Sequence, residues 1–480
     1  MLAPESKQGF PGQRGYSTMR RIYSVVLAVF LSSHAAAQIA TTTSLVGTVL
    51  DSTGKVVPGA AVTAVNTGTR DTYNTTTNEQ GYYLIQFVRI GNYELTVKQP
   101  GFRTYQISGI QVNINQVVRN DVVLEVGEVR QTITVESSVT AIKTDDASVS
   151  EIISTRAVSE LPLSGRDPMR LAITTPGVLL GTKSSMTGIP PGNDYVGAGT
   201  REIQNSLSLD GISIMNNLIT TTPTRPMVET VQEVEVQTGT YSAQYGAYMG
   251  VHINMITKGG TNTLHGSAVE FLRNQVMDAR TFFTLPTPAN PTAAKPPLRQ
   301  NQFGVELDGP VIIPKLYNGK DRTFFMTSYE GLRLVQQSTS LSTQMPANFF
   351  KGDFSAVPVT SITGGAIKDP LNNNAPFADR MIPASRISPV PLKLQQYYRA
   401  PNLPGLASNL SVPVPSTQKY DQTVNRVDRN IGDKVRLYVR THWQEWNTFG
   451  GSANPVNATT VPTTVTNYTF GYTHTLTPFL

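Results

Sequence analysis

The chain lacks cysteine and carries little charge, and both absences narrow its chemistry. None of its 480 residues is cysteine, which excludes disulfide scaffolds, thiolate metal sites and cysteine nucleophiles. Only 15% of the residues are charged, against roughly 25% in ordinary soluble domains. The net charge of +6 is spread along the chain without a long Lys/Arg run, so a nucleic-acid partner is not expected.

Long hydrophobic runs are also missing. The longest candidate, Ile22 to Leu31, is shorter than the roughly 20 residues that a membrane-spanning helix needs. It follows Arg20-Arg21 and precedes Ala35-Ala36-Ala37, the pattern of a cleaved secretory signal. We therefore assign residues 1–37 to a signal peptide, with Met19 as a second candidate start. An exported chain without such helices can enter a membrane only as a β-barrel.

Turn formers are abundant instead, with 38 glycines and 32 prolines and no collagen repeat. Residues 43–125 contain seven short β-prone runs separated by turn signals, which is typical of a β-sandwich. Alternation places Tyr83, Ile85 and Phe87 on one strand face. It places Tyr93, Leu95 and Val97 on another, and the two faces are predicted to share a core.

The string from Gly81 through Tyr83, Gly91 and Tyr93 to Gly101-Phe102 resembles the carboxypeptidase regulatory-like domain. The resemblance implies a transthyretin-like sandwich, also classed as a carbohydrate-binding-like fold. It further implies a structural or binding module without chemistry of its own.

Residues 126–262 contain short β-prone segments and many glycine loops, which predict a small α/β unit. Leu207 to Ile212 reads as a strand entering an Asp-Gly turn, and Val231–Thr238 and Val251–Thr257 alternate. The strings LPLSGRD, LSLDGI, VQEVEVQTGTYSAQYG and ITKGGTNTLHGSAVEFLRN resemble the plug domain of TonB-dependent outer-membrane receptors of the Oar-like type. His252 departs from that pattern as a polar residue and Tyr248 as a bulky one, and both are expected on a plug loop that faces the lumen.

The resemblance implies a TonB box shortly before the plug, and our candidate is Gln131, Thr132, Ile133, Thr134 and Val135. Such a box gives its main-chain hydrogen bonds to a sheet edge of TonB, the periplasmic energy transducer. A plain linker strand between the sandwich and the plug is the alternative interpretation.

Residues 263–480 are predicted to form the first strands of a transmembrane antiparallel barrel that is incomplete in this chain. The clearest strand places Val435, Leu437, Val439, Thr441 and Trp443 on one face and polar residues on the other. Trp443 and Trp446 are candidate interface anchors. The candidates for lumen- or ligand-facing side chains are Arg426, Arg436, Arg440, His252 and Tyr248. Salt bridges from the arginines to plug carboxylates are the alternative.

Other barrel motifs, among them DRTFFMTSYEGLR and NRVDRN, resemble the same receptors, and a long irregular loop is predicted over residues 335–420. Barrels of this type have about 22 strands of roughly ten residues each. The residues after Asn262 cannot supply that number beside long loops. The chain is therefore expected to be the N-terminal half of a longer receptor.

No enzyme, cofactor or metal site is predicted. His442-Trp443-Gln444-Glu445 fits a bare H-x-x-E spacing, but it lies in a predicted barrel strand. Only five histidines are present, and the sequence offers no suitable third ligand.

By resemblance, the chain belongs to a receptor in the outer membrane of a Gram-negative bacterium. This receptor imports a scarce solute of the siderophore, saccharide or peptide class by a TonB-driven rearrangement of the plug. Its expected partners are TonB, outer-membrane lipid and a small-molecule or oligosaccharide ligand. A surface glycan-binding or adhesion protein without transport is one alternative, and an inactive gene fragment is another.

Overall fold

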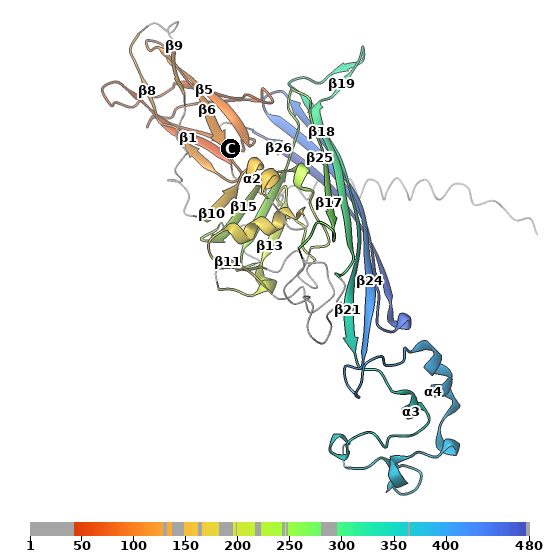
Figure 1. The fold of residues 1–480 in the computed structure, drawn as a ribbon. Helices are drawn as coiled ribbons and strands as arrows, with labels where there is room; N and C mark the ends of the chain where they lie inside the picture. Colours follow the sequence, from red (N-terminus) through yellow and green to blue (C-terminus); the bar gives the residue numbers. More distant parts are fainter. Residues whose placement is uncertain are drawn as a thin grey trace, which may run out of the picture.

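The fold comes from a computed structural model that describes eleven stretches of the chain. They are residues 43–127, 132–136, 148–161, 166–181, 195–197, 199–216, 222–241, 245, 248–279, 295–362 and 365–476. The expected signal peptide and Gln131 lie outside these residues. The chain is mainly β, as predicted (Figure 1). Within the described stretches, no helix has the length and apolar character that a membrane crossing requires.

Two sheets form an N-terminal sandwich. One sheet contains β4 (Tyr82–Gln86), β1 (Ser44–Asp51), β7 (Val117–Arg119) and β8 (Val122–Leu124). The other has the order β3 (Thr72–Thr76), β2 (Ala61–Asn66), β5 (Gly91–Lys98), β6 (Thr104–Val112) and β9 (Thr132–Glu136). Each of the seven predicted runs is found, the last of them as the two short strands β7 and β8.

The sandwich core follows the predicted alternation except at one residue. Tyr83, Tyr93, Leu95 and Val97 are fully buried. Phe87 was predicted to join them, but it is 40% exposed. The chain leaves β4 at Gln86, and Phe87 adopts a positive φ of 55°, which breaks the alternation and turns its ring away from the core.

A central unit is built on a five-stranded sheet. The strand order is β10 (Val149–Ile153), β15 (Val231–Gly239), β16 (His252–Thr257), β13 (Ser206–Leu209) and β14 (Ile212–Ser213). A two-stranded ribbon and short helices accompany it: β11 (Val178–Leu180), β12 (Tyr195–Gly197), α2 (Thr155–Glu160), η2 (Pro168–Thr174), η4 (Glu202–Gln204) and η5 (Val228–Thr230). β16 is buried at every position, so its alternation does not separate a buried from a solvated face. Both faces of this strand are covered.

The C-terminal half forms a six-stranded antiparallel wall. Its strands are β17 (His265–Asn274), β18 (Leu298–Pro310), β21 (Thr323–Ser342), β24 (Leu410–Ile431), β25 (Val435–Gly450) and β26 (Thr459–His474), in this spatial order. β21 and β24 pair from Thr323↔Arg429 to Ser342↔Leu410. The loop predicted over 335–420 therefore shrinks to residues 343–409, because its flanks continue the hairpin.

The two ends of the wall differ. One end carries the sandwich, the tight β24–β25 turn and the small hairpin of β19 (Ile312–Ile313) and β20 (Tyr317–Asn318) (Figure 1). The other end carries the long loop with α3 (Ala347–Phe350), β22 (Lys368–Asp369), β23 (Ala375–Pro376) and α4 (Pro389–Leu394). Short 3-10 turns complete the described elements: η8 (Val359–Ser361), η9 (Ala378–Arg380), η10 (Ala384–Arg386), η11 (Gln395–Tyr397) and η12 (Pro455–Asn457).

The wall strands alternate as the sequence predicts for β25. Arg436, Arg440 and Gln444 are buried, whereas Val439 and Trp443 are exposed. Trp446 is a correction, because it is only 8% exposed and packs edge-on against Tyr420 at a ring distance of 5.7 Å. Side chains alternate along β25, so Trp446 lies on the same buried face as Arg440 and Gln444, opposite to Trp443.

Candidate functional site

The site begins at the Asp-Gly turn between β13 and β14. Asp210 and Gly211 both have positive φ values, 51° and 78°, as a two-residue hairpin turn requires. This turn projects the Asp210 carboxylate onto the end of β16. There Oδ1 accepts a hydrogen bond from the Thr257 backbone N–H at 2.8 Å, and Oδ2 accepts one from the Thr257 hydroxyl at 2.9 Å.

Two arginines of the wall converge on the same carboxylate. Arg440 Nη1 lies 2.6 Å from Asp210 Oδ2, and Arg426 Nη1 lies 3.1 Å from Oδ1. Arg440 is fully buried. A buried charge that loses its partner costs about 3–5 kcal/mol, so this contact ties the central unit firmly to the wall.

The ion pairs continue from the wall to the sandwich. Arg426 binds Asp428, two residues along β24, at 2.8 and 3.0 Å, and Asp428 in turn pairs with Arg89 of the sandwich. Arg89 also lies 3.6 Å from Asp71. Burial alone would lower the pKa of Arg89, but Asp428 and Asp71 raise it above its ordinary value. We call the series Arg440, Asp210, Arg426, Asp428, Arg89 and Asp71 the charge chain.

A second contact joins the sandwich to the central unit. Glu233 Oε2 accepts a hydrogen bond from the Ile114 backbone N–H at 2.9 Å, and Asn115 Nδ2 donates to Glu235 Oε2 at 2.6 Å. We call these four residues the acid latch. Burial, with a smaller contribution from the neighbouring Glu235, raises the pKa of Glu233 to about 7 against the opposing effect of the Ile114 N–H. The Glu233 carboxyl therefore changes charge near neutral pH.

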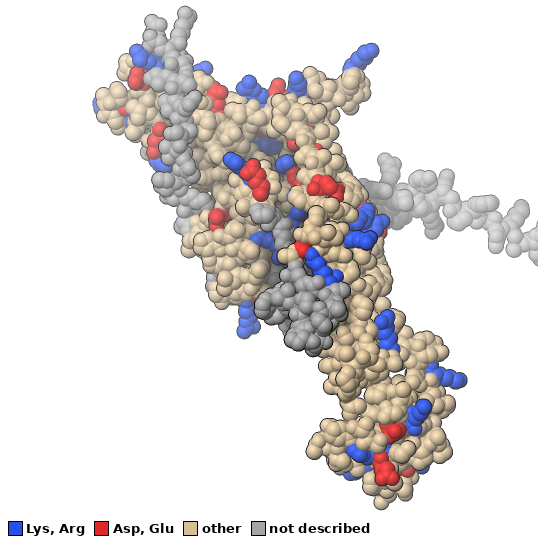
Figure 2. Space-filling model, viewed as in Figure 1, with Lys and Arg blue, Asp and Glu red and all other residues tan. Residues whose placement is uncertain are grey.

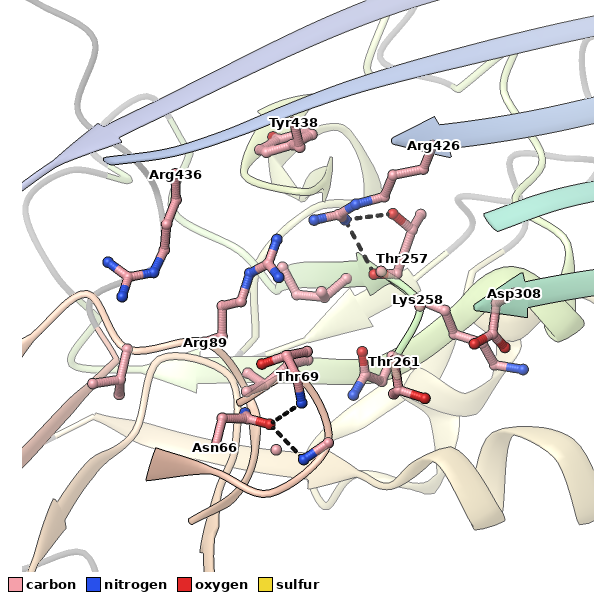
Figure 3. Close-up of a pocket in the computed structure, with 18 of the residues that line it drawn as sticks. Asn66, Thr69, Arg89, Thr257, Lys258, Thr261, Asp308, Arg426, Arg436 and Tyr438 are labelled. Carbon is pink, nitrogen blue, oxygen red and sulfur yellow. Dashed lines mark hydrogen bonds between the residues drawn. The ribbon is translucent and has the colours of Figure 1, made fainter. Parts of the chain in front are cut away.

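A cavity of about 410 Å³ lies where the three parts meet (Figure 3). The sandwich contributes Asn66, Thr69 and Arg89, the central unit contributes Thr257 and Lys258, and the wall contributes Arg426, Arg436 and Tyr438. The charges that join the parts are inside the molecule. On the face drawn in Figure 2, the positive and negative side chains lie interspersed.

The residues predicted from the sequence to face the lumen or a ligand lie in different parts of the structure. Arg426 and Arg440 are in the charge chain, and Arg436 lines the cavity. His252 is the first residue of β16 rather than a loop residue, and it is 2% exposed, with ring distances of 4.2 Å to Tyr241 and 6.4 Å to Tyr248. Burial lowers the pKa of His252 to about 4, so the ring is neutral at physiological pH.

The candidate TonB box is only partly described. Thr132, Ile133, Thr134 and Val135 belong to β9, which pairs in parallel with β6 from Thr104↔Thr132 to Ser108↔Glu136. β9 is the edge strand of its sheet. The candidate segment therefore already has extended backbone with one paired side.

The histidine and the glutamate of the H-x-x-E segment point to opposite faces of β25. His442 is buried and its Nε2 lies 2.9 Å from Gln422 Oε1, whereas Glu445 is exposed. Among the described residues, no group of three or more His, Asp or Glu side chains has the arrangement of a metal site.

Comparison with known proteins gives two family matches. Residues 256–480 match the outer membrane beta barrel domain, and residues 44–125 match the carboxypeptidase regulatory-like domain. The TonB-dependent transporter Oar of Myxococcus xanthus is 27% identical over an alignment of 383 residues, and the match covers 73% of this chain and 32% of the relative. The chain is homologous to a TonB-dependent transporter. The matches place this chain in the outer membrane of a Gram-negative bacterium.

The chain spans about a third of the length of the curated relative that it matches. Solved structures with some likeness include the outer membrane transporter YddB from Escherichia coli, at 10% identity and a TM-score of 0.43, covering 68% of this chain and 37% of that one. Another is the siderophore receptor PiuA from Acinetobacter baumannii, at 13% identity and a TM-score of 0.33, covering 68% and 42%. Scores this low do not establish a shared fold, so the assignment rests on the family matches and on Oar.

Sequence reasoning missed three central residues of the site. Asp210 was read only as a turn residue, although it also anchors two arginines. Glu233 lies in the VQEVEVQT string, which was read only for its alternation and its family resemblance, and Arg89 belongs to no motif. Glu233 alone offered a signal, as an acidic residue within a buried β-strand, because a buried charge requires a partner; Asp210 lies in a turn and Arg89 between β4 and β5.

Proposed function

We propose that this chain provides the sandwich, the plug and the first barrel strands of a TonB-dependent receptor that imports a solute of the siderophore, saccharide or peptide class. The observation that carries the proposal is the charge chain, which fixes the central unit to the polar face of the wall. A plug must be held in this way while the receptor is closed, and it must be released when force is applied. Ion pairs suit this role, because water can replace them once the parts separate.

The two ends of the wall support an orientation. Outer-membrane barrels have short periplasmic turns and longer extracellular loops. The end with the β24–β25 turn and the sandwich would then face the periplasm, and the long loop of residues 343–409 would face outside. This orientation places β9 on the side where TonB acts.

TonB would bind β9 by adding a strand to its free edge or by displacing it from β6. The test is Ile133→Pro, because proline removes a main-chain N–H and disfavours pairing. We expect Ile133→Pro to abolish binding of the purified TonB periplasmic domain to the detergent-solubilised protein, measured by calorimetry. Ile133→Ala is the matched control and should bind like the parent. Equal binding by Ile133→Pro would refute the assignment of the box.

An adhesion protein that binds glycans without transport is the competing function. It requires no partner at β9 and no movement of the central unit. A parent chain that never binds the TonB domain but retains an oligosaccharide would favour it.

A further inference from the structure

We propose that the cavity between the sandwich, the central unit and the wall is a binding site for a small oxyanion, a carboxylate or phosphate group held by Arg436. The inference goes beyond the proposed import function, since it concerns the end of the wall that carries the sandwich and does not depend on transport.

The guanidinium of Arg436 is buried without an anionic partner. Arg436 is 7% exposed, yet among the described residues its Nε and Nη1 have no hydrogen-bond acceptor. Its Nη2 has only the Thr72 carbonyl oxygen at 3.5 Å, at the limit of a hydrogen bond. A buried, unpaired charge costs several kcal/mol, so the site favours any ligand that supplies the missing acceptors.

The neighbouring arginines differ from Arg436 in this respect. Arg89, Arg426 and Arg440 each lie within ion-pair distance of an aspartate. No carboxylate of the described residues lies within 4.0 Å of Arg436 in the same way, and the side chain instead covers the Tyr73 ring at 4.0 Å. The aromatic face supports the cation but offers no acceptor to its N–H groups.

Arg436 and the cavity are placed to receive a ligand that bridges two parts of the molecule. Arg436 extends from β25 toward the sandwich, and Arg89 rises from the sandwich beside it (Figure 3). Both line the cavity, whose volume of about 410 Å³ is within the range of small-ligand sites. Lys258 and Thr69 line the same space, but the Lys258 ammonium pairs with Glu306 and the Thr69 N–H donates to Asn66 Oδ1, so Arg436 is the residue that offers donors to a ligand. An oxyanion bound there would connect the wall to the sandwich and strengthen their contact.

The test measures binding of inorganic phosphate and, separately, of succinate to the detergent-solubilised full chain by isothermal titration calorimetry. We expect one saturable site for at least one of the two probes, and the probe that binds identifies the preferred oxyanion. Arg436→Gln removes the charge and shortens the side chain while leaving it polar, and it should weaken affinity roughly ten- to a hundredfold. Arg322→Gln, at an exposed arginine just before β21 on the same end of the wall, should leave affinity unchanged.

Two results would overturn the proposal. One is the absence of saturable binding for both probes in a parent protein that is folded by circular dichroism. The other is binding that Arg436→Gln leaves intact. Loss of fold in Arg436→Gln would be detected by the same spectrum, and Arg436→Lys, which keeps the charge, then serves as the second variant and should retain measurable binding. TonB binding by the parent is measured separately, so failure here is distinguishable from failure of the import function.

Discussion

Asp210 has three structural roles in the charge chain. It closes a hairpin turn, caps the end of β16 and neutralises two arginines of the wall. These roles depend differently on its charge, because asparagine also tolerates the turn conformation and also accepts a hydrogen bond from Thr257. Charge and geometry can therefore be separated by one substitution.

We expect Asp210→Asn to lower the free energy of unfolding by about 3–5 kcal/mol, because Arg440 and Arg426 lose the charge they share. Urea unfolding followed by tryptophan fluorescence measures this change. The matched control is Asp433→Asn at an exposed turn position, where a change within about 0.5 kcal/mol is expected. Equal effects of the two substitutions would show that the buried ion pairs do not hold the parts together.

Glu233 makes the acid latch sensitive to pH. Its folded-state pKa of about 7 exceeds its ordinary value of 4.5, so the folded protein holds a proton that the unfolded chain has released. The free energy of unfolding contributed by this group therefore falls as pH rises from about 4.5 to 7 and remains low above that range.

We expect Glu233→Gln to remove this loss, so that the variant gains on the parent as pH rises from 5 to 8, by on the order of 3 kcal/mol at most. Parallel urea titrations at several pH values give the difference directly. His252 acts in the opposite direction, because its lowered pKa makes the free energy of unfolding rise between about pH 4 and 6.5. This contribution is the same in the parent and the variant, so it cancels in their difference. Glu79→Gln, on an exposed turn of the sandwich, should show the same pH dependence of the unfolding free energy as the parent. If Glu233→Gln differed from the parent by the same amount at every pH, the predicted role of Glu233 would be wrong.

At the scale of the element, the wall depends on close approach between neighbouring strands. Tyr438 on β25 lies across from Gly471 on β26, and a Cβ at Gly471 would come within 1.9 Å of the Tyr438 ring. The ring lies 4.4 Å from the Arg426 guanidinium. Gly471 thus leaves the space in which Tyr438 supports the charge chain.

We expect Gly471→Ala to displace Tyr438 and to cost about 1–3 kcal/mol in unfolding free energy. Gly450→Ala, on β25, meets only the Thr459 hydroxyl at 3.4 Å and should be tolerated. Urea unfolding of the two variants side by side is the measurement. A tolerated Gly471→Ala would mean that the ring position is not fixed by this glycine.

Sequence patterns predicted the elements better than their contacts. The seven sandwich runs, the Asp210-Gly211 turn and the alternation of β25 follow from local propensity and period, which each segment carries in itself. The burial of Phe87, Trp446 and β16 was not predicted correctly. Phe87 is exposed because β4 ends before it, and Trp446 and β16 are buried because other parts of the molecule cover them. The ion pairs of Asp210 join residues 216 and 230 positions apart, and local patterns contain no information on such pairing.

At the scale of the whole molecule, the charge chain and the acid latch connect the sandwich, the central unit and the wall. Both contacts consist of polar groups that water can replace. The arrangement is therefore expected to be stable at rest and separable by a partner that pulls on β9. Binding of an anion at Arg436, as proposed above, would further stabilise the contact between the wall and the sandwich.

The most direct test measures the distance between the sandwich and the wall. Because the chain contains no cysteine, Lys98→Cys and Lys320→Cys, two exposed positions, allow specific spin labelling. Double electron–electron resonance should give one narrow distance distribution in the otherwise parental protein. Arg89→Gln combined with Asp428→Asn should broaden it, whereas Arg322→Gln should not. A distribution that stays narrow without the Arg89–Asp428 pair would contradict the claim that the charge chain holds the parts together.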